Sequence, residues 1–430
     1  MTPELHRLDL VAAAAGIAAG EFTSAELVTA CLARIRARES QVGAWVWLHP
    51  EQALAQARDC DQRTASAPLH GVPIAVKDII NTADMPTCYG SRIYDGDMPE
   101  QDAQCIRLLR AAGAVILGKT VSTEFAFFAP GKTANPHNLE HTPGGSSSGS
   151  AASVADFHVP IALGTQTSGS IIRPASYNGV LGYKPTYEAY SLDGIHPLAP
   201  ALDTLGAFSR SPADLALLHG ILAGEQSKKP HTAQPATVAL VRTPAWTEAE
   251  AQTQQAVLDF ARRLQQAGID VIEPAEDLLQ GLMEVQQACL ARGAAASLGT
   301  VTDRYPDQVR PQTRDLVAEG RAVDESFEAR LHEAQARGER FLCEVFSKAD
   351  LIITPSAAGA APAGLHNTGD PIFNRIWTFL QTPCMNLPLT RGAHGLPVGL
   401  QLVCNKQEDE QLFGYAAYLQ NLTSYQIELP

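Results

Sequence analysis

The chain has 430 residues, and its 46 acidic side chains outnumber the 32 basic ones to give a net charge of -14. Nucleic acid and anionic membrane surfaces attract clustered positive charge, so this acidic balance makes both poor partners. With 45% hydrophobic and 18% charged residues, the composition excludes a disordered chain or a coiled coil and predicts a large folded core.

The sequence shows neither a membrane span nor a disulfide framework. Its eight cysteines are dispersed without a CxxC pair, which predicts reduced thiols and no metal finger. No apolar run reaches the ~18–20 residues of a membrane-spanning helix. The apolar stretch 11–20 follows acidic rather than basic residues, so it does not resemble a signal peptide. We therefore expect a cytoplasmic protein.

The predicted elements begin as helices and continue as an alternation of strands and helices. Thr23 followed by Glu26 is typical of a capping box, and the segment 1–65 is rich in Ala, Leu, Glu and Arg. The expected strands are 72–76, 114–117, 238–241, 269–272, 351–354 and 398–403, and the expected helices are 102–112, 151–155, 247–266 and most of 275–345. This alternation predicts an α/β fold.

Two loops rich in Gly and hydroxyl side chains interrupt this pattern. The first covers Thr142–Ser150, and the second, Gly164–Ser170, follows only fourteen residues later. A flexible linker is one interpretation of the first loop, but its flanks are apolar and core-forming, unlike the ends of two domains. Both loops follow apolar runs, which favours a shared site.

Two nucleotide- and hydrolase-type motifs fit these loops poorly. Gly164–Ser170 has the glycine spacing of a phosphate loop but lacks the lysine that this motif needs before its hydroxyl residue. Gly145–Gly149 matches G-x-S-x-G with Ser147 as the nucleophile. That nucleophile elbow must follow a buried strand, whereas a Thr-Pro-Gly turn precedes this one.

The segment His137–His141 fits the zinc-hydrolase pattern H-x-x-E-H, which requires both histidines on one face of a helix. Pro136 and Pro143 bracket the segment, and the residue before a proline is pushed out of helical space. Histidines packed in a loop are therefore the favoured interpretation.

Lys77 offers a base that is not histidine. It ends the apolar run 72–76, where burial would disfavour the ammonium form and lower the pKa of the amine. A neutral lysine can deprotonate a serine. Taken alone, Lys77 is better explained as a strand-end cation or as the partner of Asp78, and only its combination with the two serine loops favours a base.

Lys77, the run 143–152 and the run 164–174 together resemble the amidase signature family. The resemblance is clear over about 65–225 and extends to 350–430. It implies an α/β/α sandwich with a mixed central β-sheet covered by helices. It also implies one amidase domain over 1–430, divided into N-terminal helices (1–65), a signature core (66–225), a variable helical and βαβ region (226–345) and a C-terminal core part (346–430).

The resemblance implies a Ser-cisSer-Lys triad without metal or cofactor. Ser170 would be the nucleophile, Ser146 the bridging serine in a cis peptide, and Lys77 the base. The backbone from Thr167 through Ser168 and Gly169 to Ser170 would form the oxyanion hole. The residues expected to bind substrate are Arg173, Ser147, Thr165 and Gln166.

The second loop departs from the commonest family pattern. Gln166 stands where that pattern has an acidic residue, Ser168 where it has glycine, and Ile172 where it has arginine. Arg173, one position later, resembles malonamidase-like amidases, where this arginine holds a substrate carboxylate. A salt bridge inside the protein is the alternative role for Arg173.

We therefore expect a homodimeric amidohydrolase that cleaves a small amide bearing a carboxylate, such as malonamate or a carboxylated urea. A broad aliphatic or aryl amidase is the enzymatic alternative. The departures count against an amidotransferase of the A-subunit type. An inactive binding protein is also disfavoured, because it would need neither a buried lysine nor both serines.

Overall fold

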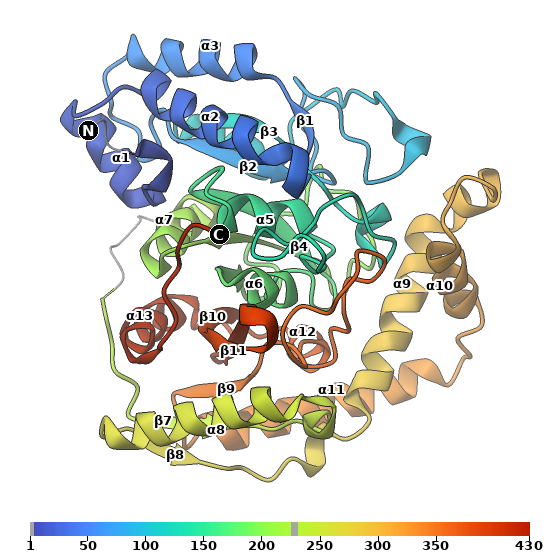
Figure 1. Cartoon of the computed structure of the whole chain (residues 1–430). Helices are drawn as coiled ribbons and strands as arrows, with labels where there is room; N and C mark the ends of the chain where they lie inside the picture. The colour runs from blue at the N-terminus through green and yellow to red at the C-terminus, as the bar shows by residue number, and fades with distance from the viewer. Residues whose placement is uncertain (1–3, 225–230) are drawn as a thin grey trace.

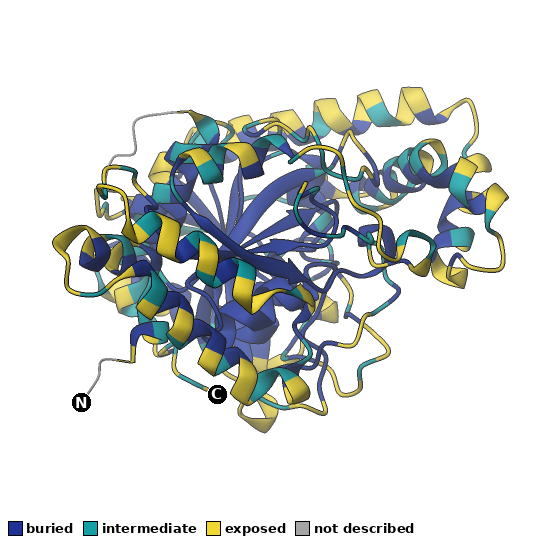
Figure 2. Cartoon of the chain, turned by 90° about the horizontal axis from the view of Figure 1, so that it is seen from above, coloured by how far each residue is buried: buried dark blue, intermediate teal, exposed yellow. Residues whose placement is uncertain are grey.

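One mixed sheet runs through residues 4–224 and 231–430, the part of the chain that the computed structural model describes (Figure 1). Within these residues it has eleven strands in the order β1-β3-β2-β4-β6-β5-β10-β11-β9-β7-β8. Helices surround it, with buried faces turned inward and exposed faces outward (Figure 2). This is the predicted α/β fold, with a mixed central sheet covered by helices. The expected boundary between 225 and 226 falls at residues outside the described part.

The strands are β1 (Trp45–Leu48), β2 (Pro73–Lys77), β3 (Val115–Thr120), β4 (Ile161–Gln166), β5 (Leu181–Lys184), β6 (Thr204–Ser209), β7 (Thr237–Leu240), β8 (Asp270–Ile272), β9 (Leu351–Pro355), β10 (Cys384–Arg391) and β11 (Pro397–Val403). The helices are α1 (Leu10–Ala19), α2 (Ser24–Val42), α3 (Pro50–Asp61), α4 (Gln104–Ala111), α5 (Ser148–Ala155), α6 (Ile172–Asn178), α7 (Pro212–Ala223), α8 (Ala251–Gln266), α9 (Leu282–Arg304), α10 (Pro311–Arg321), α11 (Phe327–Phe346), α12 (Arg375–Phe379) and α13 (Asp409–Leu419).

The local sequence signals explain where several elements begin. The capping box forms as predicted, with the Thr23 side chain accepting from the Glu26 N–H and the Glu26 carboxylate accepting from the Thr23 N–H. The helix expected from 247 begins only at Ala251, because a separate 3-10 turn covers Trp246–Glu248. The expected loop from Gly164 was wrong at its start, since residues 164–166 pair with β6 as the end of β4.

The pairing of β2 with β4 brings Lys77 close to the second Gly-rich segment, 164–170. These strands are parallel, with Ile74 opposite Ile161 and Ala75 opposite Ala162. The carboxyl ends of parallel neighbours lie at one edge of a sheet, and crevices there commonly hold ligands. Lys77 therefore ends its strand beside Thr165, and α5 packs against both strands.

The helices α9 and α10 pack on each other as an arm beside the sheet (Figure 1). The inner end of α9 reaches α12 and contributes residues to the site described below. No helix in the described ranges is both long and apolar enough to cross a membrane.

Candidate active site

Lys77 is completely buried and points at the serine loop. Its Nζ lies 2.7 Å from Ser146 Oγ and 2.8 Å from Thr165 Oγ1. Burial lowers the pKa of this lysine well below its usual value, while the charge of Asp203 opposes the shift. A neutral amine has one lone pair and two N–H groups, so it can donate to Thr165 while accepting from Ser146. The position suits a general base.

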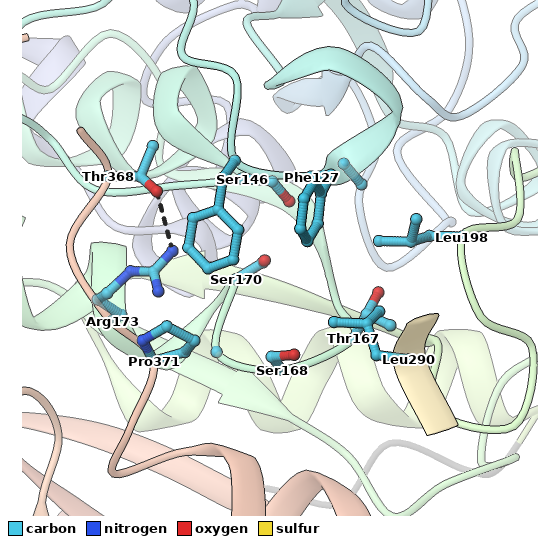
Figure 3. A pocket seen from close by; sticks show the side chains of 13 residues that line it. Phe127, Ser146, Thr167, Ser168, Ser170, Arg173, Leu198, Leu290, Thr368 and Pro371 are labelled. Carbon is cyan, nitrogen blue, oxygen red and sulfur yellow. Dashed lines mark hydrogen bonds between the residues drawn. The ribbon is translucent and has the colours of Figure 1, made fainter. Parts of the chain in front are cut away.

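Ser146 and Ser170 line one pocket (Figure 3). Ser146 precedes α5, and its peptide bond to Gly145 is cis. Ser170 lies in the turn between β4 and α6, with 9% of its surface exposed. Both hydroxyls point into the space between Phe127 and the 167–170 turn in this view. The structure thus brings the three predicted catalytic side chains to one place, with Lys77 behind Ser146.

The turn from Thr167 to Ser170 carries backbone N–H groups that donate to no acceptor among the described residues. Buried N–H groups are almost always paired, so an unpaired run beside a reactive serine suits an oxyanion hole. Thr167 and Ser170 also line the pocket.

Distant side chains hold the carbonyl groups of this turn. Gln286 Nε2 donates to the Thr167 carbonyl at 3.2 Å and to Ser168 Oγ at 2.9 Å, and Thr378 Oγ1 donates to the Ser168 carbonyl at 2.7 Å. In a trans peptide the N–H points opposite to the carbonyl of the same unit. Fixing these carbonyls away from the pocket therefore aims the following N–H groups toward it.

Gly169 completes the same arrangement. Its carbonyl accepts from the Arg173 N–H at 3.1 Å, which orients the next N–H in the same way. A Cβ at Gly169 would lie 2.3 Å from Asn374 Oδ1 and 2.7 Å from Pro371 Cβ. Only glycine fits this close approach.

Arg173 is 2% exposed and lies at one side of the pocket. Its Nη2 donates to the Gly145 carbonyl at 2.7 Å and to Thr368 Oγ1 at 3.3 Å, whereas its Nε and Nη1 have no partner in the described chain. The neighbouring Asp370 pairs with Arg375 instead. Burial lowers the pKa of Arg173 to about 10, so the guanidinium is charged at neutral pH.

The other residues expected to bind substrate have internal hydrogen bonds. Ser147 Oγ donates to the Thr165 carbonyl at 3.2 Å, so it joins α5 to β4. Gln166 accepts from the N–H groups of Ile171 and Ile172 and donates to the Thr378 hydroxyl. Neither Ser147 nor Gln166 is among the described residues that line this pocket, so their contact with substrate stays a prediction. Thr165 contacts Lys77 and lines an adjoining cavity.

The structure does not support the alternative zinc-hydrolase motif. Residues 137–141 form turns rather than a helix, so the geometry of the zinc pattern is absent from this segment. His137 and His141 bond the carbonyls of Asn178 and Ala361. No cluster of potential metal ligands occurs among the residues that the structure describes.

Gln286 and Thr378 are contributors that sequence reasoning missed. Neither lies in a recognisable motif, and they reach the turn from α9 and α12, which are far from it along the chain. Only their buried amide and hydroxyl groups in predominantly apolar surroundings could have been a signal.

We expect Gln286→Leu to lower kcat about 10- to 100-fold with little change in KM. The substitution frees the Thr167 carbonyl, so an oxyanion donor, which acts mainly in the transition state, loses its orientation. The matched control is Gln287→Leu, one position along the same helix. Equal losses in the two variants, or an effect confined to KM, would contradict the role of Gln286.

Comparison with known proteins identifies the family of the chain. The Amidase family model matches residues 26–413. The A subunit of the glutamyl-tRNA(Gln) amidotransferase from Chloroflexus aggregans is 32% identical over 99% of both chains. A crystal structure of an amidase superposes with a TM-score of 0.88 at 28% identity, covering 97% of this chain and 100% of that one. The native peptide amidase of Stenotrophomonas maltophilia gives 0.81 at 28% identity, covering 97% of each.

The fold and the family match define an amide-hydrolysing enzyme. The chain belongs to the amidase signature family.

Proposed function

We propose that the protein hydrolyses a small amide that carries a carboxylate, through Ser170, Ser146 and Lys77. Malonamate and carboxylated ureas are the model substrates, in line with the resemblance to malonamidase-like amidases. The observation that carries the proposal is Arg173, a buried cation at the pocket with two unpartnered nitrogen atoms. A buried guanidinium with unpaired N–H groups is costly, and a guanidinium matches a planar carboxylate with two hydrogen bonds.

In the proposed reaction, neutral Lys77 takes a proton from Ser146, which takes one from Ser170 as its Oγ attacks the amide carbon. The negative oxygen of the tetrahedral intermediate is held by the N–H groups of the 167–170 turn. Collapse of the intermediate breaks the C–N bond, and the proton returns through Ser146 to the departing amine. Water then attacks the ester on Ser170 with the same relay as base, which releases the acid and regenerates the enzyme.

Arg173→Gln tests the carboxylate contact. We expect kcat/KM for malonamate to fall about 100-fold or more, because an unpaired substrate anion in this pocket loses a charge-assisted pair. Turnover of a neutral amide such as propionamide should change far less. Ammonia release from both substrates is the measurement, and Arg375→Gln, beside the pocket but paired with Asp370, is the control.

A wild-type preference for neutral amides, combined with a general loss of stability in Arg173→Gln, would assign the arginine a structural role. The function would then be a broad aliphatic or aryl amidase.

The similarity to the amidotransferase A subunits over the full length supports a second candidate function. In that case the chain would release ammonia from glutamine beside partner proteins. Gln166, Ser168 and Ile172 depart from the commonest signature pattern and count against it. Release of ammonia from glutamine but not from malonamate would favour the amidotransferase role. We also propose that the protein is cytoplasmic, from its dispersed cysteines and the absence of a signal-peptide pattern, and that it is a homodimer, as the family resemblance suggests.

A further inference from the structure

A second cavity adjoins the catalytic pocket on the side away from Arg173. It has a volume of 230 Å³. Most of its wall is apolar and comes from the strand end after β2 and from the 192–200 loop: Ile79, Leu192, Ile195, Pro197, Leu198 and Pro200. An apolar space of this kind takes up apolar groups, as a protein cavity of about 150 Å³ takes up benzene. The volume suits a ring or a chain of roughly six carbon atoms.

The cavity shares part of its wall with the site of reaction. Ala126, Thr167 and Leu198 line both spaces. In Figure 3, Arg173 lies on one side of Ser146 and Ser170, whereas Thr167 and Leu198 lie on the other. A substrate whose carboxylate meets Arg173 and whose carbonyl meets Ser170 therefore extends toward the cavity with its opposite end.

The position of the proton relay bears on which half of the substrate extends toward the cavity. Thr165, whose hydroxyl contacts Lys77 at 2.8 Å, lines the cavity. The Lys77 end of the relay therefore lies on the cavity side, whereas Ser146, which passes the proton to the departing nitrogen, lines the adjoining catalytic pocket. With the carboxylated acyl half at Arg173, the amine half of the amide is the half that faces the cavity.

The polar groups in the wall disfavour an anionic occupant. The Asp203 carboxylate already accepts from the Thr167 hydroxyl at 2.6 Å and from the N–H groups of Leu198 and Ala199. Its negative charge repels a second anion. Burial lowers the pKa of His196 to about 4, so this ring supplies no positive charge at neutral pH.

We propose that this cavity binds a compact apolar substituent on the amide nitrogen, so that the preferred substrates are N-alkyl or N-aryl amides. The inference rests on the proposed function in one respect, namely that the acyl half carries the carboxylate. The leaving group is then a small primary amine rather than ammonia.

A homologous series of N-alkyl malonamates, from methyl to octyl, tests the proposal through amine release. Each methylene buried in the cavity should raise kcat/KM about fourfold. The rise should end at roughly six carbons, where the cavity is full. Alkylamines of this series differ little as leaving groups. The chain length at which kcat/KM stops rising, called the break below, therefore reports the space available in the cavity.

Leu192→Trp should move the break to shorter chains, because the indole enters the cavity from a half-buried loop position. The matched control is Leu139→Trp, at a site 38% exposed and outside both cavities; its break should stay in place. Ile195→Phe replaces Leu192→Trp if the latter misfolds.

A kcat/KM that falls from the first methylene onward would overturn the proposal. So would a break at the same chain length in the wild type and in both cavity variants. N-alkyl propionamides run in parallel separate it from the proposed function. If the carboxylated series is inert but the neutral series shows the same break, the cavity stands and the role of Arg173 fails.

Discussion

Ser170→Ala is expected to reduce kcat by about 10⁴- to 10⁶-fold. The substitution removes the only oxygen that forms the acyl-enzyme in the proposed reaction, while the 167–170 turn keeps its backbone contacts. The fold should be unaffected, because no hydrogen bond within the described chain uses the Ser170 hydroxyl. Ammonia release and thermal unfolding of the variant check both parts.

Ser168→Ala is the matched control, two positions away in the same turn and also in the pocket wall. Its hydroxyl accepts a hydrogen bond from Gln286 and takes no part in the proposed chemistry. We therefore expect kcat to fall about tenfold or less, which is a smaller loss than removal of an oxyanion donor causes. If Ser168→Ala is as inactive as Ser170→Ala, the assignment of the nucleophile is wrong.

Lys77→Met is expected to lower kcat by about 10²- to 10⁴-fold, the usual range for loss of a general base. Methionine keeps much of the length of the side chain but removes the lone pair that faces Ser146. The dependence of wild-type activity on pH should show the titration of Lys77. Activity should be retained above the lowered pKa of Lys77 and lost below it, where the amine is protonated.

The same variant should be more stable than wild type at neutral pH. Because burial lowers the pKa of Lys77 in the folded state, the unfolded chain binds its proton more tightly. Stability is therefore lost as pH falls below the usual lysine value of 10.5 toward the folded value. Thermal unfolding of Lys77→Met should give a higher Tm at pH 7 and no gain above pH 10.5. Loss of activity together with loss of stability would instead make Lys77 a structural residue.

Several strands with an apolar run were predictable from the sequence, whereas others were not. The segments of β2, β3, β9 and β11 are short apolar runs typical of buried strands. The segments of β5, β6 and β10 were not predicted as strands. They are strands because antiparallel neighbours from other parts of the chain complete their hydrogen bonds, as when β10 pairs with β5.

The sequence by itself determined the α/β class, the family and the candidate chemistry, since Lys77, Ser146 and Ser170 lie in contiguous motifs. Local order is enough to recognise a turn of Gly and Ser or a lysine at a strand end. The sequence also placed an arginine three residues after the proposed nucleophile.

Only the tertiary structure decided which polar groups are satisfied inside the protein and which face the pocket. Ser147 and Gln166 bond to neighbouring backbone, whereas Arg173 keeps two nitrogen atoms free. Gln286 and the second cavity come from segments that meet only on folding. Hydrogen-bond partners and enclosed volume depend on non-local packing, which residue order along the chain does not specify.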